Sequence, residues 1–302
     1  MKRDLCVNLN GLALKNPVTV ASGTYGFGRE YAEYIDLNHL GAISVKGLTL
    51  EPREGNEGRR IAETPMGMLN SVGLQNPGVH YFVDNEIPFL RQFDLKIIAN
   101  INGNTIEDYC LMAEILSSAD VDSIELNISC PNVKNGGLAF GTNPQVVKEV
   151  VSRVRAKTQK HLIVKLSPNV TDIKEIAKIV EAEGADCIAM INTVSGMAID
   201  IYQRRTVLKR GSGGLSGPAI KPIAVKLIND VYQAVKIPIL GMGGIMSGED
   251  AAEFLLAGAT AVAIGTGNFV NPNAPVDVLS GLEVYMEKMG YRAISEITGD
   301  LK

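Results

Sequence analysis

Residues that bind metals are scarce in this chain. Its 302 residues include only three histidines and four cysteines, and the cysteines lie far apart. No two cysteines have the C-x-x-C spacing and no histidine lies near a cysteine, so the sequence predicts neither a zinc site nor an iron–sulfur cluster within this chain. A disulfide framework is not expected in a chain of this length either. We interpret His39, His80 and His161 as surface or structural residues in helix-like or connecting segments.

The chain also lacks an excess of positive charge and any long hydrophobic run. Its net charge is −4, whereas a nucleic-acid-binding protein normally has a basic patch. No apolar run reaches transmembrane length, and the first five residues contain no apolar segment of a signal peptide. We therefore expect a cytoplasmic protein that contacts neither nucleic acid nor membrane. With 46% hydrophobic and 21% charged residues, the composition fits a single globular domain over residues 1–302.

Short apolar segments rich in β-branched residues recur along the chain, and most are separated by amphipathic segments with helical spacing. Eight strands that alternate with helices predict a parallel sheet, and eight is the number that closes an α/β (β/α)8 TIM barrel. The predicted strands are 18–21, 42–46, 96–101, 123–129, 162–167, 187–193, 237–241 and 261–265, and the clearest helices are 105–118, 144–157, 171–183, 218–235 and 247–257.

A doubly wound Rossmann sheet is the competing architecture. It requires a glycine fingerprint that opens a helix after an early strand, and residues 22–28 follow that pattern poorly. Two connections, 49–78 and 194–217, are too long for simple loops and follow strands, so they predict insertions at the C-terminal face of a barrel. Residues 8–11 predict the turn of a small N-terminal β-hairpin that caps the opposite end.

Polar residues end most of the predicted strands. The C-terminal strand ends carry the chemistry of such barrels. Burying a lysine there is costly unless the ammonium meets an anion, although a lysine can also extend to solvent. Two lysines and three asparagines at equivalent positions favour a binding site. The residues are Ser22, Lys46, Asn100, Asn127 with Cys130, Lys165, Asn192 with Thr193, Gly243 with Gly244, and Gly265 with Thr266.

The glycines after the seventh and eighth predicted strands indicate a phosphate site. Glycine lets backbone N–H groups approach an oxyanion closely, and this position binds phosphate in many barrels. A helix that begins near Ser247 would add its positive dipole end. The sequence offers no obvious carboxylate pair for hydrolysis and no Ser–His pair. A phosphorylated cofactor beside a small polar substrate therefore fits best, and flavin mononucleotide (FMN) satisfies these conditions.

Cys130 occupies the most informative position. Pro131 ends the preceding strand, so the thiol lies at a strand tip between Asn127 and Asn132, before a glycine-rich loop. Taken alone, these residues leave open a buried structural cysteine, which is the usual role of an unpaired cysteine.

Three motifs resemble the class 1 dihydroorotate dehydrogenases. They are Asn-Ile-Ser-Cys-Pro-Asn at 127–132, Asn-Ser-Val-Gly-Leu-Gln-Asn-Pro-Gly at 70–78 and Gly-Met-Gly-Gly-Ile at 241–245. The likeness covers essentially the whole chain, and the loops 74–78 and 133–141 resemble the NAD-linked subgroup 1B rather than the fumarate-using subgroup 1A. Class 2 enzymes have serine in place of Cys130 and an N-terminal membrane segment.

The resemblance implies oxidation of (S)-dihydroorotate to orotate in pyrimidine synthesis. Cys130 would accept the C5 proton, hydride would leave C6 for flavin N5, Lys165 would face the N1–O2 edge of the flavin, and the loop 131–141 would act as a lid. The implied substrate-binding residues are Lys46, Asn70, Ser71, Val72, Gly73, Leu74, Asn127, Asn132, Asn192 and Thr193. The implied FMN-binding residues are Ser22, Lys46, Gly47, Asn100, Asn127, Lys165, Ile191, Gly217, Gly243, Gly244, Gly265 and Thr266.

The same resemblance implies a partner. In subgroup 1B a second subunit with FAD and a [2Fe–2S] cluster passes electrons to NAD, and the expected assembly is a heterotetramer built on a dimer of this chain. The chain has neither cluster ligands nor a dinucleotide fingerprint, which agrees with that division. The alternatives are another FMN barrel such as a dihydropyrimidine-type or dihydrouridine-type oxidoreductase, a phosphate-binding isomerase or lyase without flavin, and a non-catalytic binding protein.

Overall fold

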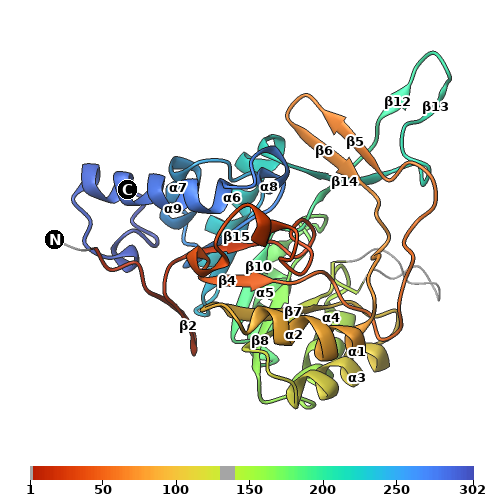
Figure 1. The fold of residues 1–302 in the computed structure, drawn as a ribbon, viewed down its shortest axis with the longest axis horizontal. Coiled ribbons are helices and arrows are strands. Elements are labelled where there is room, and N and C mark those ends of the chain that lie inside the picture. The colour runs from red at the N-terminus through yellow and green to blue at the C-terminus, as the bar shows by residue number, and fades with distance from the viewer. Residues whose placement is uncertain (1–2, 130–139) are drawn as a thin grey trace.

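A computed structural model describes residues 3–129 and 140–302. Eight parallel strands form a closed barrel in the order β10-β15-β16-β3-β4-β7-β8-β9, which confirms the predicted TIM barrel (Figure 1). All eight strands lie within or overlap the predicted segments. They are β3 (Val18–Val20), β4 (Ala42–Ser44), β7 (Lys96–Ile101), β8 (Ser123–Asn127), β9 (His161–Lys165), β10 (Cys187–Met190), β15 (Ile239–Met242) and β16 (Ala261–Ile264).

Helices surround the barrel, and their boundaries follow from local sequence. Thr105 and Asp108 form a capping box at the start of α3, and Ser247 and Asp250 form another at the start of α7. The main helices are α3 (Ile106–Ser117), α4 (Pro144–Arg155), α5 (Ile173–Ala182), α6 (Lys221–Tyr232), α7 (Gly248–Leu256) and α9 (Ala274–Met289). The short helical elements are η1 (Tyr31–Glu33), η2 (Leu37–His39), α1 (Val79–Tyr81), η3 (Phe82–Glu86), α2 (Ile87–Leu90), η4 (Pro218–Ile220), α8 (Gly267–Val270) and η5 (Ile294–Glu296).

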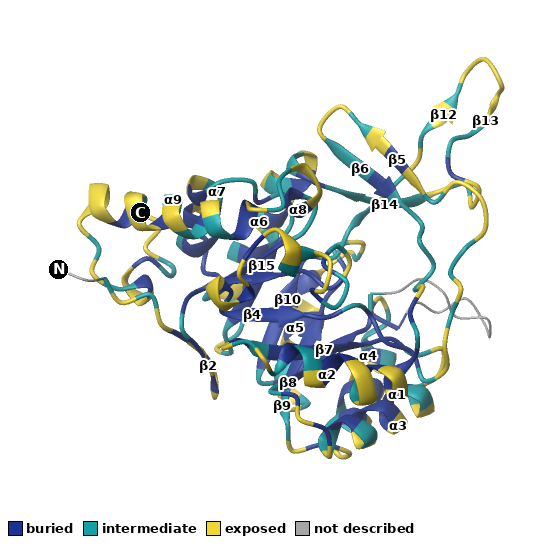
Figure 2. Ribbon diagram, in the orientation of Figure 1, coloured by how far each residue is buried: buried dark blue, intermediate teal, exposed yellow. Residues whose placement is uncertain are grey.

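The strands are covered on both sides, as a parallel barrel requires. Every residue of β8, β10, β15 and β16 is buried, and Figure 2 shows the barrel strands in dark blue inside helices whose outer faces are exposed. None of the helices within 3–129 and 140–302 is both long and apolar enough to cross a bilayer.

The predicted N-terminal hairpin is present and lies at the N-terminal ends of the barrel strands. Strands β1 (Val7–Leu9) and β2 (Leu12–Leu14) pair antiparallel. Their three leucines, Leu9, Leu12 and Leu14, are buried. The ring of His161 lies with Nε2 2.5 Å from the Leu9 carbonyl oxygen and Nδ1 2.9 Å from Ser123 Oγ. His161 is the first residue of β9 rather than part of a connector, and burial lowers its pKa. Its role is therefore structural, as predicted.

The two long connections form a second sheet that the sequence did not reveal. It has the order β11-β14-β6-β5 and comprises β5 (Ile61–Thr64), β6 (Gly67–Asn70), β11 (Val194–Gly196) and β14 (Gly213–Ser216). The hairpin of β12 (Ile199–Asp200) and β13 (Arg205–Thr206) extends from the same region (Figure 1). Both insertions follow barrel strands, so the prediction of their place on the C-terminal side is confirmed.

Candidate functional site

The predicted polar residues converge at the C-terminal ends of the barrel strands. Asn127, the last residue of β8, lies opposite Lys165, the last residue of β9. Asn100 of β7 lies opposite Glu125, two residues earlier in β8. The side chains of Asn100, Asn127 and Lys165 are buried, as is Ser22 just after β3. The barrel therefore holds amides and an ammonium group in its mouth, where they are kept from bulk water.

A buried ion pair lies beneath this mouth. Lys165 Nζ is 3.6 Å from Oε1 of Glu125, and the Glu125 side chain has no solvent exposure. The Asn100 amide donates to Glu125 Oε1 at 3.0 Å, and the Ser44 hydroxyl donates to Oε2. Glu125 and Ser44 are not among the site residues predicted from the sequence. A signal was present, because Glu125 is an acidic residue between Ile124 and Leu126 in an apolar strand.

A chain of hydrogen bonds joins the ends of β8 and β10. Asn127 Oδ1 accepts from the Ser129 backbone N–H at 3.2 Å and from the Ser129 hydroxyl at 2.5 Å. The Asn192 amide donates to the same hydroxyl. The hydroxyl of Tyr109 on α3 donates to the Asn127 carbonyl oxygen at 2.8 Å, which fixes the position of this strand end. Ser129 orients both asparagines, although it is not among the site residues predicted from the sequence.

The second sheet brings Asn70 to the same mouth. Asn192 Oδ1 accepts from the backbone N–H of Thr193 at 2.8 Å. A Cβ on Gly214 would lie 2.0 Å from Thr193 Oγ1, so the threonine packs directly on the backbone of β14. Asn70 lies opposite Gly214 in the β6–β14 pairing, and its amide donates to the Gly214 carbonyl oxygen at 3.3 Å. Three segments far apart in the sequence thus form one wall.

The predicted turn 71–74 continues this wall. Gly73 and Leu74 both have positive φ, at 83° and 57°. The Ser71 backbone N–H donates to the Arg60 carbonyl oxygen at 2.7 Å, while Ser71 Oγ is buried with no hydrogen-bond partner within the described ranges. An unpaired buried hydroxyl is costly unless a ligand or water satisfies it. Ser71 therefore marks a position where a polar ligand group fits.

Two cationic side chains interact near this wall. Lys46 is half-buried after β4, and its pKa is lowered first by burial and second by the positive charge of Arg60. An anionic ligand would relieve both effects. Lys46 is predicted from the sequence to contact both the substrate and FMN, whereas Arg60 is not among the predicted site residues.

Glycines from three loops form a narrow cradle beside the mouth. A Cβ on Gly244 would lie 2.8 Å from the Gly217 carbonyl oxygen, and a Cβ on Gly217 would lie 3.4 Å from Thr266 Cγ2. The Thr266 hydroxyl donates to Ser216 Oγ at 2.7 Å. Gly265 has more room, since the nearest atom to its would-be Cβ is Ala21 Cβ at 3.8 Å. Gly243, Gly244 and Gly265 are only half-buried after the last two strands and carry no side chain to cover their backbone N–H groups, which suits a phosphate group.

Gly47 and Ile191, the remaining predicted cofactor residues, contact other residues of the predicted site. A Cβ on Gly47 would lie 2.5 Å from the amide nitrogen of Asn102 and 3.1 Å from Oδ1 of Asn100. Ile191 packs against Gly243, whose would-be Cβ lies 3.3 Å from Ile191 Cγ1. The site combines a glycine cradle after the last two strands with a buried ammonium group. These features fit FMN.

Cys130 and Asn132 lie outside the described residues, as do residues 131–139 of the predicted lid. Their assigned roles remain predictions. Among the described residues, no group of three or more His, Cys, Asp and Glu side chains could hold a metal ion.

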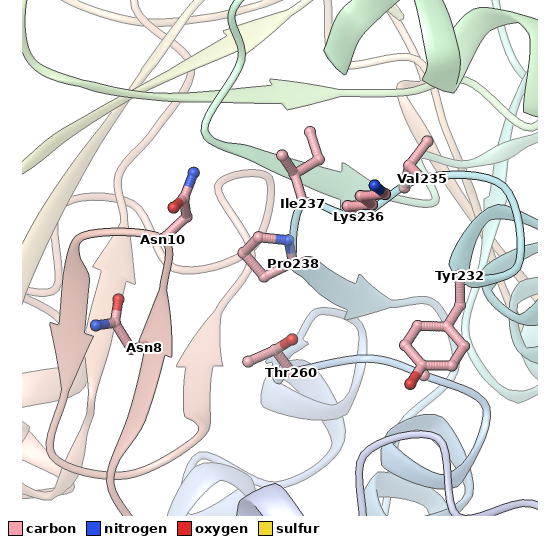
Figure 3. Close-up of a pocket in the computed structure, with 9 residues that line it drawn as sticks. Asn8, Asn10, Tyr232, Val235, Lys236, Ile237, Pro238 and Thr260 are labelled. Carbon is pink, nitrogen blue, oxygen red and sulfur yellow. The ribbon is translucent and has the colours of Figure 1, made fainter.

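A cavity of about 300 Å³ lies at the other end of the barrel (Figure 3). It is lined by the N-terminal hairpin and by Ile237, Pro238 and Thr260, which precede β15 and β16. The N-terminal ends of barrel strands serve stability, whereas the C-terminal ends serve function. This cavity is therefore separate from the polar mouth.

Comparison with known proteins agrees with the motifs. The family model described as dihydroorotate dehydrogenase matches residues 4–286. A protein of Alkaliphilus metalliredigens named "Dihydroorotate dehydrogenase B (NAD(+)), catalytic subunit" is 58% identical over 300 residues, with 99% of each chain covered. Proteins of the same name from Thermoanaerobacter pseudethanolicus and Desulforamulus reducens are 57% and 54% identical, again over 99% of each chain.

Proposed function

Because the chain belongs to the dihydroorotate dehydrogenase family, we propose that it is the FMN-binding catalytic subunit of an NAD-linked enzyme. It oxidises (S)-dihydroorotate to orotate in pyrimidine synthesis. The observation that carries this assignment is the wall of residues Asn127, Ser129, Asn192, Thr193 and Asn70, in which Asn127 lies opposite the buried Lys165 in the β8–β9 pairing. That wall presents amide groups to a planar ring with amide edges, and the cradle suits a phosphate.

The residues divide into three roles. Gly217, Gly243, Gly244, Gly265 and Thr266 hold the FMN phosphate through close backbone approach. When bound, FMN supplies the hydride acceptor of the reaction. Lys165 places its positive charge at the N1–O2 edge of the flavin ring. Further flavin contacts come from Ser22, Lys46, Gly47, Asn100, Asn127 and Ile191.

The substrate is held by charge and by amide hydrogen bonds. Lys46 binds the substrate carboxylate, and Arg60 strengthens the positive potential at that point. Asn70, Asn127, Asn132, Asn192 and Thr193 bind the ring amides, together with the turn Ser71, Val72, Gly73 and Leu74. Because the substrate is held at several of its edges, it binds in a single orientation that suits both proton and hydride transfer.

Cys130 acts as the general base that accepts the C5 proton. An unperturbed thiol has a pKa of about 8.5, which is far closer to neutrality than that of an alcohol. Anaerobic mixing of the purified protein with dihydroorotate tests the assignment, since the flavin absorbance should bleach. Cys130→Ala should keep FMN and bleach far more slowly. Cys130→Ser should be slow near neutrality and faster as the pH rises. Near-normal bleaching in the alanine variant would remove Cys130 from this role.

Electrons leave through a partner that carries FAD and a [2Fe–2S] cluster, within a heterotetramer built on a dimer of this chain. Exposed apolar side chains on the projecting hairpin support a protein contact, because large apolar patches mark interaction sites. Tyr202 is 92% exposed there, beside Met197, Ile199 and Ile201. The isolated chain should pass electrons from dihydroorotate to an artificial dye and reduce NAD negligibly, until the partner is added. Rapid NAD reduction by the chain alone would refute this route.

A further inference from the structure

Glu125 is a carboxylate in an unusual place. Only three charged residues within 3–129 and 140–302 are almost fully buried, namely Glu86, Glu125 and Lys165. Glu86 pairs with Arg29 at 2.7 Å, and the Arg29 side chain is half exposed. Glu125 and Lys165 instead pair with each other inside the barrel, on adjacent strands. Burying two charges costs solvation free energy, so such a pair requires either a structural or a functional reason.

The Glu125 carboxylate is held from three directions. Asn100 of β7 donates to Oε1 at 3.0 Å, and the hydroxyl of Ser44, the last residue of β4, donates to Oε2. Lys165 of β9 supplies the cation. Because these partners come from three different barrel strands, the carboxylate cannot rotate without losing a buried hydrogen bond. Its position relative to the barrel mouth is fixed.

The contact with Lys165 differs from the other two. At 3.6 Å, the separation of Lys165 Nζ and Glu125 Oε1 is too long for a hydrogen bond. The carboxylate therefore attracts the ammonium electrostatically without engaging its N–H donors closely. Attraction between charges is stronger in this water-excluded interior than at the surface. Glu125 thus orients the ammonium from inside the barrel, and the N–H groups of the ammonium can donate to a group bound in the mouth.

We propose that Glu125 is a positioning residue for Lys165 that also sets the redox potential of the bound flavin. It holds the Lys165 ammonium in the position where it would meet the N1–O2 edge of the flavin, and it offsets part of the positive charge of the ammonium. Reduction of FMN by two electrons and one proton adds a negative charge near N1, which the ammonium stabilises. The carboxylate behind the ammonium weakens that stabilisation and keeps the potential lower than Lys165 alone would set it. This inference rests on the proposed function, because it requires FMN in the mouth.

The test is the midpoint potential of the FMN-loaded protein, measured by anaerobic equilibration with reference dyes. Glu125→Gln keeps the size of the side chain but removes the charge. Its amide oxygen can still accept from Asn100, and its amide nitrogen can donate to the Ser44 hydroxyl. Its potential should become more positive. The ratio of the dissociation constants of oxidised and reduced FMN should change at least tenfold. For a two-electron couple, a tenfold change corresponds to a shift of about 30 mV in the midpoint potential. Glu125→Asp keeps the charge but withdraws it from Lys165, so it should shift the potential in the same direction and by less.

Glu86→Gln is the matched control, since it removes a buried carboxylate that pairs with Arg29. Its potential should equal that of the unmodified protein. An unchanged or more negative potential in FMN-loaded Glu125→Gln would overturn the proposal, as would an equal shift in Glu86→Gln. If Glu125→Gln does not fold, Glu125→Asp decides the matter: a positive shift supports the proposal and no shift overturns it. An unmodified protein that binds no FMN would refute the proposed function instead.

Discussion

The phosphate cradle can be tested by adding one methyl group. Gly244 has φ +95° in the loop after β15, a conformation that residues with a side chain rarely adopt. A Cβ at this position would lie 2.8 Å from the Gly217 carbonyl oxygen and 3.0 Å from the Lys221 backbone nitrogen. Both are backbone atoms, so Gly244→Ala forces two loops apart rather than displacing a flexible side chain.

The size of the effect follows from these two causes. In the left-handed backbone conformation, alanine lowers the free energy of unfolding by about 1 kcal/mol relative to glycine. For a chain of this length, that loss lowers Tm by about 2 °C. The forced separation also moves backbone N–H groups away from the phosphate. Loss of one hydrogen bond to a charged group costs about 1.5–3 kcal/mol. The dissociation constant of FMN should therefore rise roughly tenfold to hundredfold.

Gly290 provides the matched control. It has φ +82° at the C-terminal end of α9, and no atom lies within 4 Å of its would-be Cβ. Gly290→Ala should lower Tm by a similar amount through strain alone and keep full FMN content. The assay is flavin absorbance relative to protein absorbance after purification, followed by titration of the apoprotein with FMN. Normal FMN affinity in folded Gly244→Ala would show that the phosphate lies elsewhere.

Three further predictions concern charge, pH and helix capping. In FMN-loaded protein, Lys46→Gln should raise KM for dihydroorotate roughly tenfold to hundredfold, because a charged hydrogen bond to the substrate carboxylate is lost. An unchanged KM would exclude Lys46 from carboxylate binding. Burial lowers the pKa of His161 in the folded state, so the unfolded state binds more protons below about pH 6.5 and stability falls as the pH falls. His161→Asn should therefore lose less stability than the unmodified protein in thermal melts between about pH 7 and about pH 5.5, and parallel curves would contradict the assignment. Ser247→Ala removes the capping hydrogen bond to the Asp250 backbone N–H, 3.2 Å long, and should cost about 1 kcal/mol in denaturant unfolding without changing flavin content; no loss would show that the cap is unimportant.

Local sequence determined the barrel and most of the candidate mouth. Strands that are buried on both sides appear as short apolar segments, and caps such as Thr105 and Ser247 mark helix starts, so these elements can be identified without their neighbours. Once eight strands alternate with helices, their C-terminal ends must meet at one face. The positions of Lys165, Asn127 and the glycines of the cradle follow from that geometry.

Tertiary structure alone decided which of these residues touch. The Glu125–Lys165 pair joins residues 40 positions apart in the chain, and Ser44 reaches Glu125 across 81 positions. The second sheet pairs Asn70 with Gly214 across 144 positions. Short polar or glycine-rich strands carry little periodic signal, and their register depends on partners far along the chain rather than on local preference. The sequence therefore predicts which residues reach the mouth, whereas the hydrogen bonds that orient them arise only when the barrel closes.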